Sequence, residues 1–151
     1  MKIKKRNLLG LMSFWPPLLG AGIKVDFIAP DFTEIKVSMK LRFWNRNYVN
    51  THYGGSLYSM TDPFIMLMLM EQLGPKFIVW DKMASINFKK PGVGKVQAHF
   101  HVSKEEVDKI KSELEEKEKV YPQFIVHVVD EVGDIVCEVT KTLYVKKKNK
   151  K

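Results

Sequence analysis

One acidic side chain and two glycines lie close together in the most apolar part of this 151-residue chain. Gly54 and Gly55 follow a polar stretch, and Asp62 comes seven residues after Gly55 within an apolar run. Backbone N–H groups at a helix start have no partner within the helix, so they can bind an oxyanion. A carboxylate about two turns further on would be the one ionised group in an apolar wall. This combination suits acyl chemistry, in which a carboxylate activates water or attacks a carbonyl while N–H donors stabilise the oxyanion.

Each nearby residue also has a purely structural interpretation. Asp62 can stabilise a helix start through the helix dipole. Gly55 can serve the strand-to-helix turn alone, and this is compatible with a functional role of its N–H. Asn47 can orient an attacking water through its amide, although an isolated Asn at a strand end is more often a turn residue. His52, beside the glycines, can donate to a substrate or cap the turn.

Alternation of apolar and polar residues predicts the strands that position these groups. Residues 34–44 form the clearest strand. Its expected inward side chains are Ile35, Val37, Met39, Leu41 and Phe43. Further strands are expected at 23–28, 77–90, 94–102, 122–130 and 134–145.

Residues 56–73 predict one long helix that is apolar on all sides and therefore buried. Gly74 ends this helix, and Pro63 removes a backbone donor within it, which predicts a kink near Asp62. Residues 103–106 form a capping box that opens a second, amphipathic helix. The order of two strands, a buried helix and four more strands predicts an α+β fold, with an antiparallel sheet of about six strands wrapped around the central helix.

The composition is typical of one globular domain, with 45% hydrophobic and 28% charged residues. We expect an N-terminal arm at 1–22, the domain at 23–145 and a basic tail at 146–151. The formal net charge of +8 is concentrated at the two ends, which is typical of solvated tails and would also suit an anionic partner. The sequence has no zinc-finger spacing, basic strand interleaved with aromatics or helix-turn-helix pattern, so a nucleic-acid partner is not expected.

The first residues resemble a secretory signal, because the basic residues 2–6 precede an apolar run. Pro16 and Pro17 interrupt this run, and no small-residue cleavage site precedes Ile23, so an amphipathic arm is the favoured interpretation. The side chains expected to pack the arm on the domain are Leu8, Leu11, Met12 and Trp15. No stretch reaches the ~20 apolar residues of a membrane span.

Cysteine and histidine usage gives no indication of a metal site. Cys137 is the only cysteine, so an intrachain disulfide and a cysteine-based metal site are both excluded. This usage fits a cytoplasmic location. His99 and His101 are two residues apart on one expected strand, but no third ligand accompanies them, so neither a metal nor a bound cofactor is expected.

The order of elements and the segment around the glycines resemble the hotdog fold, and specifically the PaaI-type acyl-CoA thioesterases. The family pattern is an Asn, then His-Gly-Gly, then an acidic residue on the central helix seven positions after the second glycine. In this chain Asn47 stands six residues before Tyr53. Gly54 and Gly55 follow, and Asp62 occupies the acidic position.

The resemblance covers residues 23–145, and 86–94 look like the family's segment leading into its following strand. One position departs from the pattern: Tyr53 stands where the family has His, and His52 lies one position early. More narrowly, the chain is similar to an uncharacterised bacterial branch described as tetrameric acyl-CoA thioesterases.

The resemblance implies hydrolysis of acyl-CoA or related thioesters, with coenzyme A as part of the substrate. Asp62 would act as general base or nucleophile, Gly55 would donate its N–H to the oxyanion, and Asn47 would position the water. In hotdog thioesterases a polar residue of the partner subunit, on the strand after the helix, often completes the site. The similarity puts Asp81 near that place, although it can also be an ordinary strand-end acid. The expected substrate-binding residues are His52, Tyr53, Gly54 and Ser56, with Ser85 on the same face as Asp81.

The implied enzyme is a homodimer or homotetramer with its site at the subunit interface. If Asp62 and Asp81 enter one site, their repulsion should raise the pKa of one of them. A non-catalytic acyl-CoA-binding protein is the alternative, since fold does not dictate function. A basic scaffold protein is a second alternative. A hydratase or dehydratase of the same fold is disfavoured, because the sequence lacks their spacing of Asp and His and their Pro-His-Phe-Pro setting.

Overall fold

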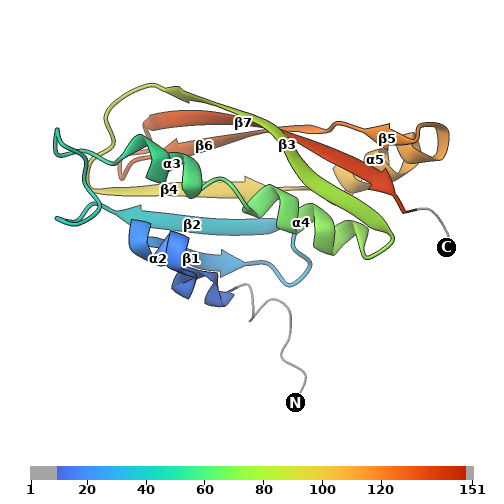
Figure 1. The fold of residues 1–151 in the computed structure, drawn as a ribbon, viewed down its shortest axis with the longest axis horizontal. Helices are drawn as coiled ribbons and strands as arrows, with labels where there is room; N and C mark the ends of the chain where they lie inside the picture. Colours follow the sequence, from blue (N-terminus) through green and yellow to red (C-terminus); the bar gives the residue numbers. More distant parts are fainter. Residues whose placement is uncertain (1–9, 149–151) are drawn as a thin grey trace, which may run out of the picture.

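The computed structural model describes residues 10–148 and contains an antiparallel sheet of seven strands with the order β1-β2-β4-β6-β7-β3 (Figure 1). The seventh strand, β5, is short and lies outside this order; it pairs with β7. The strands are β1 Ile23–Ile28, β2 Glu34–Lys40, β3 Phe77–Phe88, β4 Lys95–His101, β5 Lys119–Val120, β6 Gln123–Val129 and β7 Ile135–Lys147. The helices are η1 Leu11–Phe14, α2 Pro16–Ala21, α3 Gly54–Ser59, α4 Phe64–Leu73 and α5 Lys104–Glu116. The predicted α+β architecture is confirmed; the short strand β5 was not expected.

The core lies between the inner face of the sheet and α4. Alternate residues of the central strands are buried, because successive side chains of a strand point to opposite faces. Met68 and Leu69 of α4 have no exposed surface, and the Phe64 ring lies 5.1 Å from that of Phe100 on β4. The predicted capping box of α5 is also present, since Ser103 Oγ accepts the N–H of Glu106 and Glu106 Oε2 accepts that of Ser103.

The expected single helix at 56–73 is instead two helices, α3 and α4, separated by a turn (Figure 1). Pro63 has no N–H with which to continue the ladder of α3, so the predicted kink is a full interruption. Asp62 lies in this turn. The backbone carbonyl of Asp62 is therefore free to accept a hydrogen bond from a side chain, and Lys141 donates one.

The strand predicted at 34–44 ends at Lys40, because β4 begins at Lys95, the residue that pairs with Lys40. Beyond it the chain turns, and Asn45 Oδ1 accepts the N–H of Arg42 at 2.7 Å. Phe43 was expected to point inward, but it is 79% exposed. That part of the prediction is wrong, since alternation continues in the sequence after the partner strand has ended.

The arm packs on the domain through different side chains from those expected. Met12 contacts the core and Leu18 is buried, whereas Leu11 and Trp15 are each more than half exposed. Leu8 lies outside the described residues. Ser13 Oγ accepts the N–H of Val25 at 2.9 Å, so the arm also covers part of the free edge of β1.

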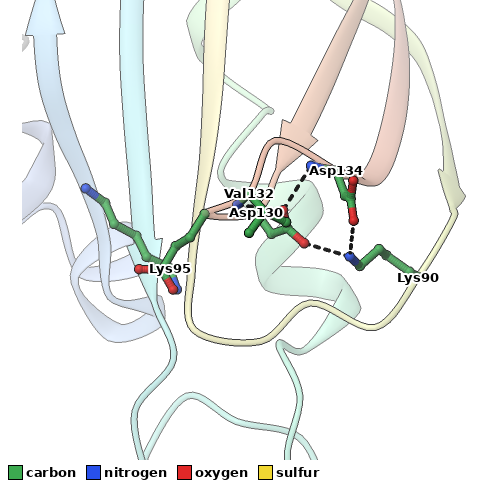
Figure 2. Close-up of polar contacts among 6 residues, drawn as sticks. Lys90, Lys95, Asp130, Val132 and Asp134 are labelled. Carbon is green, nitrogen blue, oxygen red and sulfur yellow. Dashed lines mark hydrogen bonds and ion pairs between the residues drawn. The ribbon is translucent and has the colours of Figure 1, made fainter.

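A lysine fixes the connection between β3 and β4. Figure 2 shows Lys90 Nζ between Asp130 Oδ2 and Asp134 Oδ2, at 2.7 Å and 2.9 Å, at the turn between β6 and β7. Asp130 Oδ1 also accepts the N–H groups of Val132 and Asp134. The hydrogen bond to Lys90 lowers the pKa of Asp130 and raises that of Lys90. This ion pair links the connection 89–94 to the β6–β7 turn.

Candidate active site

Asp62 is the central acid of the candidate site, and its side chain is 48% exposed. Oδ1 accepts hydrogen bonds from the Tyr58 hydroxyl at 2.9 Å and from Lys141 Nζ at 3.0 Å. The backbone carbonyl of Asp62 accepts from the same Nζ at 2.8 Å. Oδ2 accepts no hydrogen bond from the residues between 10 and 148. The expectation of a lone ionised group is therefore wrong: Asp62 is paired through one oxygen and open at the other.

Lys141 joins the two acids Asp62 and Asp81, and the sequence patterns did not single it out. Its side chain has no exposed surface, and its Nζ also lies 3.0 Å from Asp81 Oδ1. Val139 and Leu143, two residues to either side on β7, are likewise fully buried. The available signal was the alternation along residues 139–145, which places a lysine among inward-facing apolar residues.

Asp81 lies on β3, the strand that the family resemblance pointed to, and its side chain is 27% exposed. Burial raises the pKa of Asp81, and the nearby charge of Asp62 adds to this rise, while the hydrogen bond from Lys141 opposes it. The predicted effect of one carboxylate on the other is thus present for Asp81. The two acids come together within one chain through their shared lysine.

A β-bulge in β3 decides which side chains share the face of Asp81. Asp81 pairs with Leu143, but the register shifts between Asp81 and Met83. After the shift, Ser85 pairs with the outward-facing Thr140, whereas Ala84 pairs with Lys141. The expectation that Ser85 lies on the same face as Asp81 is therefore wrong, because the extra residue reverses the alternation.

Tyr58 completes the polar cluster from α3. Lys141 Nζ lies 5.6 Å from the centre of the Tyr58 ring. Burial raises the pKa of the Tyr58 hydroxyl, and its hydrogen bond to Asp62 raises it further. Burial alone would lower the pKa of Lys141, but the hydrogen bonds to Asp81 and Asp62 more than compensate, so the pKa of Lys141 is raised. The cluster therefore contains a protonated tyrosine and a firmly charged lysine beside the two acids.

Gly55 lies against a hollow of ≈540 Å³. The predicted site residues Asn47, Tyr53, Gly55 and Ser56 all line it, together with residues of α2. The Tyr53 ring lies over Gly55: a Cβ on Gly55 would come within 2.5 Å of Tyr53 Cε1. A side chain at position 55 would therefore require the exposed Tyr53 ring to move. In the part of the chain that the structure describes, the N–H of Gly55 has no acceptor.

Asn47 and His52 have mainly structural contacts. Asn47 Oδ1 accepts the N–H groups of Val49 and Thr51, and its Nδ2 donates to Thr51 Oγ1, so the amide closes a loop. His52 is 3% exposed, and its Nε2 lies 3.0 Å from the carbonyl oxygen of Gly94. Burial lowers the pKa of His52. These contacts agree with the turn interpretation of both residues.

The N–H groups at the start of α3 border a second hollow. This hollow, of ≈440 Å³, is lined by Gly54, Asn47, His52 and Phe88 among others. A Cβ on Gly54 would come within 3.0 Å of the Phe88 ring, so this glycine also permits close packing. His52 Nδ1 is buried and accepts no hydrogen bond from residues 10–148. The two adjacent glycines thus line different hollows, while Asn47 lines both.

The buried thiol of Cys137 has a pKa raised by burial to about 11, so it is not a nucleophile at neutral pH. Among residues 10–148, no group of three His, Cys, Asp or Glu side chains could hold a metal ion. None of the helices in this range is both long and apolar enough to cross a membrane.

The sequence from residue 4 to residue 145 matches the model of a family described as a domain of unknown function, DUF4442. The chain belongs to the DUF4442 family. Comparison with curated proteins gives no match. The site of this DUF4442 protein can therefore be interpreted only from its own geometry and from proteins of similar fold.

Several solved structures have the fold of this DUF4442 protein. A Pseudomonas aeruginosa protein of unknown function, described as a probable thioesterase, is 16% identical with a TM-score of 0.83 over 98% of this chain and 99% of that one. A thioesterase from Haemophilus influenzae is 15% identical, with a TM-score of 0.69 over 97% and 93%. The phenylacetic acid degradation protein PaaI from Thermus thermophilus, in a mutant form, is 24% identical, with a TM-score of 0.58 over 85% and 97%. At these identities the likeness shows the fold, and the predicted hotdog architecture is confirmed.

Proposed function

We propose that this DUF4442 protein hydrolyses acyl thioesters with Asp62 as the catalytic carboxylate. The observation that carries the proposal is the asymmetry of this group: Oδ1 is held by Tyr58 and Lys141, while Oδ2 is open on a half-exposed side chain. A fixed carboxylate with one free oxygen can take a proton from water or attack a thioester carbonyl. Similarity of fold to proteins described as thioesterases supports this reaction class.

The N–H of Gly55 would stabilise the oxyanion that develops on the thioester carbonyl. It borders the ≈540 Å³ hollow, which can accept part of the substrate. Tyr53, Ser56 and the neighbouring Gly54 would contact the substrate there, and Asn47 would hold the loop that shapes this wall. His52 would stabilise the chain next to this hollow through the contact of its Nε2 with the carbonyl oxygen of Gly94. Surface lysines would meet the anionic part of coenzyme A, the expected carrier, and no other cofactor is proposed.

The site would be completed in a homo-oligomer. Within one chain, Asp62 does not line the hollow that Gly55 borders. Strand β3, which carries Asp81, forms a free edge of the sheet, so a second copy of the chain can pair there. We therefore propose that a dimer brings the acid cluster of one subunit towards the glycine hollow of the other. A cytoplasmic location stays a prediction.

The test is thiol release from short, long and aryl acyl-CoA thioesters by the wild type and by Asp62→Asn. We expect a loss in kcat of at least about 100-fold, since general acid–base groups contribute at least that much. Asp108→Asn, the same change at an exposed position of α5, is the matched control and should keep full activity.

Hydrolysis that survives Asp62→Asn would refute the assigned role. A wild type that binds acyl-CoA without hydrolysing it would support the non-catalytic binding protein instead. Calorimetric titration with a non-hydrolysable thioether analogue separates an inactive protein that binds from one that does not.

A further inference from the structure

Lys141 occupies a position that the fold otherwise gives to apolar residues. It lies on the inward face of β7 between Val139 and Leu143, and all three side chains are fully buried. A buried ammonium that lacked partners would be strongly unfavourable, so its three contacts account for its presence. All three contacts lead to the candidate site: Oδ1 and the carbonyl of Asp62, and Oδ1 of Asp81.

Lys90 provides a comparison within the same chain. It also bridges two aspartates, Asp130 and Asp134, at similar distances, but its side chain is 39% exposed. An exposed bridge of this kind contributes little and tolerates substitution. Lys141 differs because its ammonium is shielded from water by the core, so its charge acts on its two acids with little screening. Of these two bridges, the buried one lies at the candidate site.

We propose that Lys141 is a positioning residue that holds Oδ1 and the carbonyl of Asp62, so that only Oδ2 faces the substrate. The inference deepens the proposed function and rests on it. Asp81 then acts through Lys141: it shares the ammonium from the edge strand and fixes its position. The turn at Pro63 is needed for this positioning, because it leaves the carbonyl of Asp62 free to accept a hydrogen bond from Lys141.

The charge of Lys141 also favours the ionised form of the acid that it touches. The titratable groups that face it are Tyr58 from α3, Asp62 from the turn and Asp81 from β3. Removing the ammonium would leave two carboxylates beside each other and beside a tyrosine hydroxyl. The pKa of Asp81 would then rise further, because the hydrogen bond from Lys141 is what lowers it.

The experiment compares the wild type with Lys141→Met, Lys141→Arg and the double variant Lys141→Met/Asp81→Leu. The double variant replaces the ion pair by apolar side chains, which buried sites often tolerate, so it stays folded where the single variant does not. Lys147→Met is the matched control, because Lys147 lies on the same strand and pairs with the surface residue Glu115.

The first readout is independent of activity. Carboxyl carbon-13 resonances of labelled aspartate are followed against pH. We expect the titration midpoint of Asp81, whose signal is assigned by Asp81→Asn, to rise in Lys141→Met, because the hydrogen bond from Lys141 lowers the pKa of Asp81. Lys141→Arg keeps the charge and should shift it less.

The second readout is kinetic. In Lys141→Met and the double variant, kcat should fall by about 10-fold or more while KM changes little, because positioning acts on the chemical step. The acid limb of the pH–rate profile should move to higher pH, and Lys141→Arg should restore it. Lys147→Met should leave both unchanged. An unchanged kcat and an acid limb that stays in place in folded variants would overturn the proposal.

The two proposals fail in distinguishable ways. If the wild type hydrolyses thioesters and Asp62→Asn does not, an unchanged pH–rate profile in Lys141→Met refutes the positioning role alone. If Asp62→Asn keeps full hydrolysis, the proposed function fails, while the carbon-13 titration still shows whether Lys141 controls the ionisation of Asp81. An unmoved midpoint then refutes that control as well.

Discussion

At the scale of single residues, Lys141 is a buried lysine among valines and leucines, and it needs both of its charged partners. This need explains why two aspartates lie beside it. Lys141 contacts Asp62 and Asp81 at the same N–O distance of 3.0 Å, so neither acid alone satisfies the ammonium. The unequal exposure of the acids then separates their roles. The side chain of Asp62 is the more exposed and keeps a free oxygen. The side chain of Asp81 is the more buried, and burial raises its pKa.

His52 gives a residue-scale prediction about pH. Burial lowers its pKa below the ordinary value of 6.5, so in acid the unfolded chain binds a proton more readily than the folded one. The contribution of His52 to the free energy of unfolding is therefore complete above about pH 6.5 and is lost as the pH falls towards the folded value. We expect the fall in Tm between about pH 7.5 and pH 5.5 to be smaller in His52→Gln, whose amide can still donate to Gly94.

Thermal unfolding at the two pH values measures this effect. His101→Gln, the same change at an exposed position of β4, is the control and should behave as the wild type. Equal Tm losses in the wild type and in His52→Gln would show that His52 does not titrate differently in the folded and unfolded chains.

At the scale of elements, the capping box of α5 allows a direct test of how that helix is held. Ser103 and Glu106 each satisfy a backbone N–H at the helix start. We expect Ser103→Ala to lower the free energy of unfolding by about 1 kcal/mol. This corresponds to a Tm lower by roughly 2–4 °C for a chain of this size.

Ser112→Ala is the control on the same helix, because Ser112 is exposed and lies within the helix rather than at its cap. It should leave Tm unchanged or raise it slightly, since alanine favours the helix interior. A similar loss in both variants would mean that α5 responds to any change of serine and that the cap is unimportant.

The elements also show what the sequence could predict. Strand positions followed from alternation, and the α+β order followed from the strands and the apolar helix. The register did not follow: the bulge at Asp81 and the end of β2 at Lys40 depend on the partner strands. Lys141 was missed for a different reason: the alternation of Val139, Leu143 and Val145 places it on the inward face, but a lysine is ordinarily assigned to the surface. Asp62 and Gly55 could be proposed, because their chemistry depends on local spacing.

At the scale of the whole molecule, the two edges of the sheet differ. The edge of β1 is partly covered by the arm, through the hydrogen bond from Val25 to Ser13. The edge of β3 extends over twelve residues with no strand beyond it in the described chain. Trp80, Met83 and Phe88 on β3 are each more than half exposed. A long, apolar, uncovered edge is typical of a strand that pairs with another chain.

We therefore predict that the protein is at least a dimer and that Met83→Lys shifts it towards the monomer, because an edge lysine opposes strand pairing. Light scattering coupled to size exclusion measures the mass at several concentrations. Val132→Lys, at the 81% exposed tip of the β6–β7 turn, is the control and should keep the wild-type mass. A monomeric wild type would refute the proposed assembly and with it the shared site.

The fully enclosed ammonium of Lys141 has a further consequence for how the protein meets its surroundings. Mobile ions screen charges that they can approach, over about 10 Å at 0.1 M ionic strength, but they cannot enter the core. Added salt would weaken the first encounter between the basic surface and an anionic ligand and leave the hold of Lys141 on Asp62 largely intact. In the proposed enzyme, added salt would therefore slow capture of the substrate more than it slows the chemical step.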